Sequence, residues 1–184
     1  ALWGVYAALL SKSPLVTKAI TAGVLAFGGD LMAQGFEFQR SGRNGRFDKR
    51  RLLAVVVDGA FITGPALHIL YGLLEHFMPT EGAGMFPAMY HLLLDTFLFD
   101  PAFVASFFCI TGLLENRAFF GDVLPNLRRE YWSAVCGTWA VSVVFSPLNY
   151  ITFRYCPLEL RVLSVNVCDI AWTFVISYFS HKRR

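Results

Sequence analysis

The chain alternates between apolar blocks about twenty residues long and shorter polar loops. A helix needs roughly 20 apolar residues to cross a bilayer core about 30 Å thick. A soluble domain could not bury five such blocks, which cover residues 15–36, 52–77, 88–114, 132–153 and 161–180. The pattern therefore predicts an all-α, polytopic transmembrane helix bundle, with residues 1–184 forming a single membrane domain.

Composition supports a chain that lives in lipid. Hydrophobic residues make up 55% and charged residues 16% of the chain, against about 25% charged in soluble domains, and the mean hydropathy is +0.50. The net charge of +3 alone would allow nucleic acid as a partner. However, the basic residues lie in the loops beside the apolar blocks, as in membrane proteins generally. We therefore expect the lipid bilayer, and no nucleic acid, as a partner.

The basic residues also discriminate between topologies. If all five blocks are embedded, the loop before residue 52, the loop 115–131 and the tail carry 12 of the 16 basic residues on one side. If only four blocks span, the division is 9 against 7. The positive-inside rule favours the five-segment layout, with the loop 40–51 and the tail 182–184 on one side and the loop 78–87 opposite. Asp169 interrupts the last block, so a four-span bundle with a partly embedded C-terminal helix is the alternative.

Charged residues inside apolar blocks are costly and so are candidate functional residues. Asp30 and Asp58 lie at similar depths on the basic side, where they could share a proton or receive Arg50 or Arg51. A purely structural pairing is the alternative.

On the other side, Asp95 and Arg161 are expected to form an ion pair, with Asp100 as the second choice of carboxylate. Such a pair would either fix the register of the helices or, together with Arg154, line an aqueous path.

Three prolines fall inside the blocks and predict kinked helices, because proline lacks an N–H group and clashes with the preceding turn. They are Pro65, Pro101 and Pro147. Several kinked helices in a small bundle could open a polar gap at mid-membrane, or could be an ordinary packing feature.

The sequence contains no pattern typical of catalysis or cofactor binding. It has no phosphate-binding glycine loop, and its four cysteines show no metal-ligand or disulfide spacing. His91 and Asp95 share a helix face, but no Glu-x-x-His pair accompanies them. We therefore expect no enzyme, no metal and no cofactor.

Short elements along nearly the whole chain resemble one family. They are Trp3, Tyr6 and Pro14; Gly29-Asp30 with Gln34; Gly64-Pro65 with Tyr71; Asp95 with Pro101; and Phe153, Pro157, Arg161 and Trp172. This ordered set resembles the family of small organellar membrane proteins that includes the mitochondrial inner-membrane Mpv-seventeen protein and peroxisomal membrane protein two. The resemblance implies channel-like permeation of small solutes, in the mitochondrial inner membrane or else in a peroxisomal or other organellar membrane.

The chain departs from the family pattern in its most characteristic segment. Phe145-Ser146 stands where the family has tryptophan-proline, Asn149 replaces a glutamine, and Thr152 replaces an asparagine. Asp95 is followed by Thr96 rather than glutamine. These changes favour an alternative of another class: a non-transporting accessory subunit of a large membrane complex, such as a respiratory-chain assembly. The partners would then be other membrane subunits, whereas a channel would form a homo-oligomer.

Overall fold

The computed structural model describes residues 2–40, 47–80 and 84–181, and every long element in them is a helix. In chain order these are α1 (Leu2–Lys12), α2 (Pro14–Arg40), α3 (Lys49–Asp58), η1 (Gly59–Thr63), α4 (Gly64–Phe77), α5 (Met85–Leu94), η2 (Asp95–Phe99), α6 (Asp100–Leu114), η3 (Phe119–Val123), α7 (Leu124–Tyr155) and α8 (Leu158–His181). The expected all-α membrane fold is confirmed. Four continuous segments are long and apolar enough to cross a membrane: Pro14–Arg40, Lys49–Phe77, Met85–Leu114 and Phe119–Tyr155.

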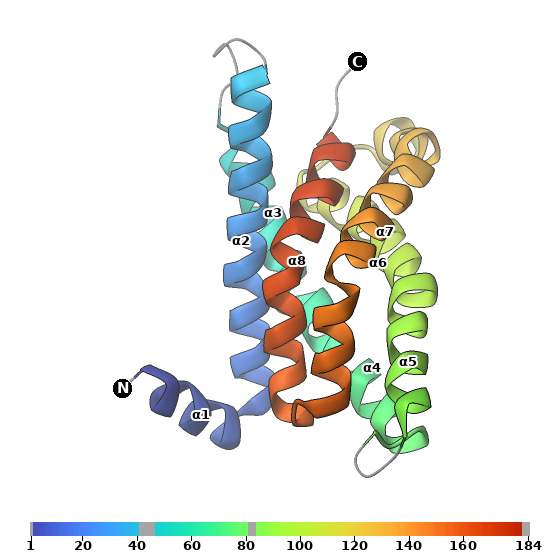
Figure 1. The fold of residues 1–184 in the computed structure, drawn as a ribbon. Coiled ribbons are helices and arrows are strands. Elements are labelled where there is room, and N and C mark those ends of the chain that lie inside the picture. The colour runs from blue at the N-terminus through green and yellow to red at the C-terminus, as the bar shows by residue number, and fades with distance from the viewer. Residues whose placement is uncertain (1, 41–46, 81–83, 182–184) are drawn as a thin grey trace.

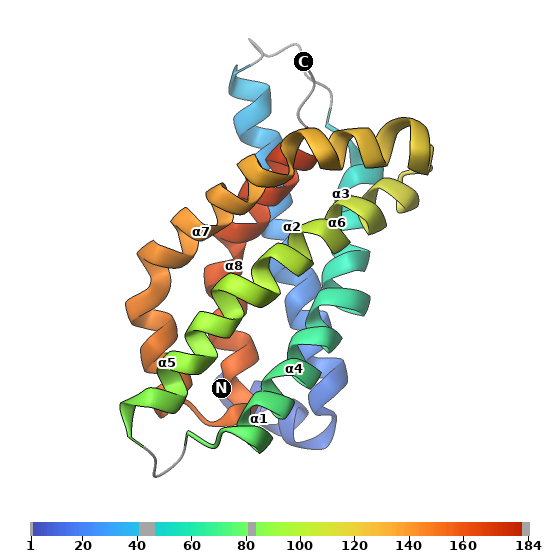
Figure 2. The same cartoon turned by 90° about the vertical axis from the view of Figure 1, so that its right-hand side faces the viewer.

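The four segments and α8 run up and down one bundle (Figure 1). Neighbouring helices close a ring in the order α2, α8, α7, α6, α3 and back to α2. At the end of the bundle away from the C-terminus, α4 packs against α2 and α8, and α5 packs against α7 (Figure 2). With 24 residues, α8 is about 36 Å long, which is shorter than the four apolar segments of 27 to 37 residues. Asp169 lies near its middle.

The ends of neighbouring helices alternate between the two ends of the bundle (Figure 1). The Arg40 end of α2 lies beside the C-terminal end of α8, where Arg40 donates a hydrogen bond to the Tyr178 hydroxyl at 3.0 Å. The ends of α4 and α5 that flank the second loop lie at the other end of the bundle (Figure 1). Residues 41–46, 81–83 and 182–184, on which part of the topology prediction rests, lie outside the described residues.

Small residues let α2 approach its neighbours closely. A Cβ atom added at Gly29 would lie 2.6 Å from Cβ of Thr173 in α8, and one added at Gly59 would lie 2.8 Å from Cβ of Ala26. In lipid, where no hydrophobic effect drives helices together, such close van der Waals packing is a main source of association. The glycines of α2 and η1 therefore set the spacing of three helices around the interior.

In three places a π-helical turn is followed by one further residue and then by a proline. The N–H groups of Gly64, Asp100 and Leu124 each donate to a carbonyl five residues earlier, and a proline follows each donor. A wider turn displaces the carbonyl with which a proline ring would otherwise collide. Pro65 and Pro101 sit directly after two of these turns, whereas Pro147 lies inside the uninterrupted helix α7.

Candidate functional site: the polar interior of the bundle

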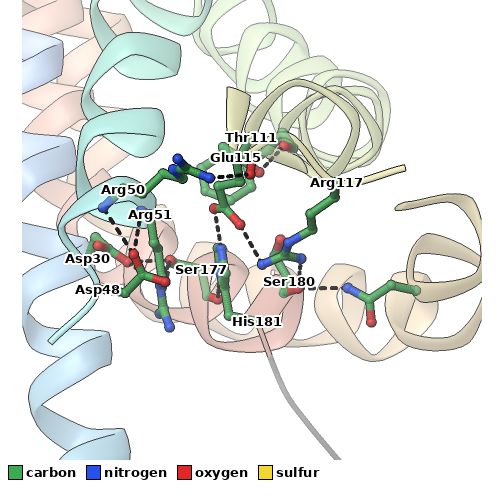
Figure 3. Close-up of polar contacts among 12 residues, drawn as sticks. Asp30, Asp48, Arg50, Arg51, Thr111, Glu115, Arg117, Ser177, Ser180 and His181 are labelled. Atoms are coloured by element: carbon green, nitrogen blue, oxygen red, sulfur yellow. Dashed lines mark hydrogen bonds and ion pairs between the residues drawn. The ribbon is translucent and has the colours of Figure 1, made fainter. Parts of the chain in front are cut away.

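An arginine-centred cluster joins α2, α3 and α8 at one end of the bundle (Figure 3). Asp48 caps α3 by accepting from the backbone N–H groups of Arg50 and Arg51. The buried Arg51 guanidinium then reaches Asp30 at 2.8 Å and Glu37 at 2.9 Å. Asp30 is therefore a paired structural carboxylate, and Arg51 is the partner it takes of the two arginines considered from the sequence.

A second cluster ties the end of α6 to the end of α8 (Figure 3). Glu115 pairs with Arg117 at 2.5 Å and contacts Nε2 of His181 at 2.6 Å. The other ring nitrogen of His181 faces the Ser177 carbonyl at 2.9 Å. Both neighbours of the ring are acceptors, so both hydrogen bonds form only when the imidazole carries two protons.

At the opposite end, Arg161 of α8 is bound to Glu75 of α4. Its Nη1 atom lies 2.6 Å from Oε2 of Glu75, and its Nη2 atom donates to the Thr80 hydroxyl at 2.7 Å. Thr80 in turn donates to Glu75 through its N–H and hydroxyl groups. Arg154 donates to the carbonyl of Thr80 at 3.2 Å. This cluster fixes α4, α7 and α8 relative to one another.

The expected pairing of Arg161 with Asp95, or with Asp100, is wrong. The hydroxyl of Tyr71 donates to Asp95 at 2.8 Å, and the hydroxyl of Ser142 donates to Asp100 at 2.9 Å. Glu75 lies on the same membrane side as Asp95 in the sequence layout, but the rotation of each helix about its axis, which hydropathy does not give, turns Glu75 toward Arg161.

Four carboxyl groups lie between the two ends of the bundle. Asp58 accepts from the Thr63 hydroxyl at 2.9 Å, and Asp169 of α8 lies within electrostatic reach of Asp95 and Asp100. Within the described part of the chain, none of the four forms an ion pair with a basic side chain. Asp95, Asp100 and Asp169 are partly buried. The middle of the bundle is therefore acidic, and its ends are neutralised by arginines.

A small cavity of about 30 Å³ lies among α2, α3, η1, α6 and α8. Asp58 of α3, together with Asp169 and Trp172 of α8, lines it. Among the described residues, no three His, Cys, Asp or Glu side chains gather as they would around a metal ion. The arrangement can bind water, a proton or a weakly coordinated ion.

The site predicted from the sequence and the site in the structure overlap in part. The structure uses Asp30, Arg154 and Arg161 in the two end clusters, and places Asp58 and Asp95 in the acidic middle. Sequence reasoning did not select Glu75, Glu115 or Asp169 as site residues. All three are acidic residues within or at the end of apolar blocks, and that signal alone could have identified them.

Comparison with known proteins gives a consistent set of relatives. The model of the Mpv17 / PMP22 family matches residues 112–177. PXMP2/4 family protein 2 of Dictyostelium discoideum is 31% identical over 184 residues, which cover 99% of this chain and 92% of that protein. Peroxisomal membrane protein 2 of Bos taurus is 33% identical, over 91% of this chain and 83% of that protein.

The mitochondrial inner membrane protein Mpv17 of Danio rerio is 28% identical, over 98% of each chain. No solved structure matches. The relatives are thus proteins of the mitochondrial inner membrane and of the peroxisomal membrane, which agrees with the localisation expected from the sequence.

Proposed function

The chain belongs to the Mpv17 / PMP22 family of membrane proteins, and we propose that it provides a channel-like path for small solutes across the mitochondrial inner membrane or a peroxisomal membrane. The observation that supports this function best is the acidic middle of the bundle. Asp95 and Asp100 lie in the membrane-spanning segment Met85–Leu114, and Asp169 lies in α8. Each is near the middle of its segment. Charged groups at that depth are costly unless they are paired or reach water.

The distribution of the ion pairs supports the same proposal. Arginines neutralise the carboxylates at both ends of the bundle, where Arg51 holds Asp30 and Arg161 holds Glu75. The middle has acceptor-rich side chains but no basic counterpart among the described residues. A polar centre between two charge clusters is the arrangement expected of a solute path that the end clusters close. No catalytic activity is proposed.

The second candidate function is that of an accessory subunit in a larger membrane assembly. It is favoured by the outer face of α7, where Val143, Val144, Leu148 and Ile151 are exposed. These residues lie in or beside the segment in which the chain departs most from the family pattern. An apolar face of this kind packs against lipid in a channel and against partner helices in a subunit.

Two measurements on the same preparation separate the candidates. The first is size-exclusion chromatography of the protein extracted in mild detergent: a homo-oligomer supports the channel, and co-elution with unrelated chains supports the subunit. The second is efflux of small entrapped solutes from liposomes that contain the purified chain.

We expect efflux faster than from empty liposomes, reduced by Asp100→Leu and unchanged by Asp122→Asn, a matched control because Asp122 lies at an exposed helix start. Absence of efflux from correctly inserted protein would reject the channel.

A further inference from the structure

The cavity among α2, α3, η1, α6 and α8 has the size of a site for water or a small ion. Its volume is about 30 Å³, and a buried site needs about 10–15 Å³ to hold one water molecule. It therefore has room for one or two waters. Most of its wall is apolar, and the exceptions include Asp58 and Asp169, which approach from different helices.

A buried polar atom in the wall, Oδ1 of Asp58, has no hydrogen-bond partner in the described part of the chain, and the side chain is only 3% exposed. Thr63 serves the other carboxyl oxygen. The side chain of Trp172, which also lines the cavity, lies beside the carboxyl group of Asp100. Leaving a buried acceptor unsatisfied costs about 1–3 kcal/mol, so Oδ1 of Asp58 indicates an occupant of the cavity that bonds to it.

The charge around the cavity defines the class of that occupant. Asp58 and Asp169 have no basic partner among the described residues. Among the described residues, the titratable groups within electrostatic reach of Asp169 include Asp95, Asp100, Tyr71 and Cys168, and none of these four carries positive charge. Two carboxylates in a low-dielectric interior require a compensating cation or a bound proton. The volume limits that cation to a small one.

We propose that this cavity is a binding site for one small monovalent cation, either a proton or an alkali metal ion, held together with water between Asp58 and Asp169. The carboxyl oxygens of both residues face the cation, and water fills the rest of the cavity. The site stands apart from solute permeation, because it needs only the packed bundle and not an open path.

Infrared difference spectroscopy of the purified full-length chain, in which the spectra in light and heavy water are compared, tests whether a carboxyl group in the cavity carries a proton. If a proton is bound, the spectrum contains a carboxylic-acid carbonyl band that shifts in heavy water. Asp58→Asn and Asp169→Asn should each remove or shift this band. Asp58→Asn preserves the acceptor for the Thr63 hydroxyl, so it is expected to fold. Asp122→Asn, outside the cavity, should leave the band unchanged.

The alkali ion is tested by thermal unfolding in detergent, with sodium or potassium replaced by the bulky cation choline. If an alkali ion occupies the site, it raises the unfolding midpoint in a saturable manner, and the two Asn substitutions weaken that dependence at least tenfold.

The proposal is overturned if folded wild-type protein shows neither the band nor the ion-dependent shift, or if Asp122→Asn changes them as much as the cavity variants do. Solute efflux is measured separately in liposomes. Cation binding without solute efflux would therefore reject the channel and retain this site. Solute efflux without cation binding would reject this site and retain the channel.

Discussion

Breaking the Arg161–Glu75 pair should destabilise the bundle more when Glu75 is replaced than when Arg161 is replaced. Glu75→Leu leaves the guanidinium of Arg161, only 4% exposed, with Thr80 as its remaining described partner. Removing one member of a buried pair costs about 3–5 kcal/mol. Arg161→Leu leaves Glu75, which is 19% exposed and still accepts two hydrogen bonds from Thr80. We expect that loss to be smaller, about 2–3 kcal/mol.

A double-mutant cycle isolates the pair itself. The free energy of unfolding is measured by titrating each purified variant with a denaturing detergent and following helical circular dichroism. Arg161→Leu combined with Glu75→Leu should cost about 2–3 kcal/mol less than the sum of the single variants, because no buried charge is left unpaired. The control cycle combines Arg161→Leu with Asp95→Leu and should be additive within about 0.5 kcal/mol. Additivity of the first cycle, or coupling in the control, would refute the observed pairing.

Three further predictions concern packing, the proline step and topology. Gly29→Val should separate α2 from α8 and lower the thermal unfolding midpoint in detergent several times more than Gly28→Ala does, because the methyl added at Gly28 meets nothing within 4 Å. Equal midpoints for the two variants would contradict the close approach of α2 and α8. Pro65→Ala restores a backbone donor and should reduce solute efflux at normal expression, whereas unchanged efflux would leave Pro65 with a packing role only. Cysteines introduced at positions 44 and 82 should react with an impermeant reagent from opposite sides, and equal reaction of both from one side would disprove the five-segment layout.

The sequence was sufficient for the fold class because membrane spans leave a strong one-dimensional signal. The limits of individual helices were harder to predict. The apolar block 132–153 lies inside a helix that begins at Leu124, because the polar turn around Arg128 continues the helix without being apolar. Proline positions were visible in the sequence, but not that each of three X-Pro steps would follow a π-helical turn.

Pairing between helices was the least predictable part of the site. Asp30 and Arg51 lie close to the same loop, so short chain connectivity brought them within reach. Arg161 could have met any carboxylate at its depth, and only the rotation of α4 about its axis decides for Glu75. Hydropathy specifies depth but not rotation, since rotation is set by packing contacts such as those of Gly29 and Thr173.

The central claim, that the acidic middle of the bundle lines a water-accessible path, is tested most directly by cysteine accessibility. In a variant whose four native cysteines are replaced, Asp100→Cys is compared in liposomes with Phe61→Cys, which is 72% exposed on the outer surface of η1. We expect a positively charged, water-soluble thiol reagent to modify the cysteine at position 100 at least tenfold faster than the cysteine at position 61, and we expect this modification to block solute efflux. Equally slow modification at both positions, with efflux unchanged, would contradict it.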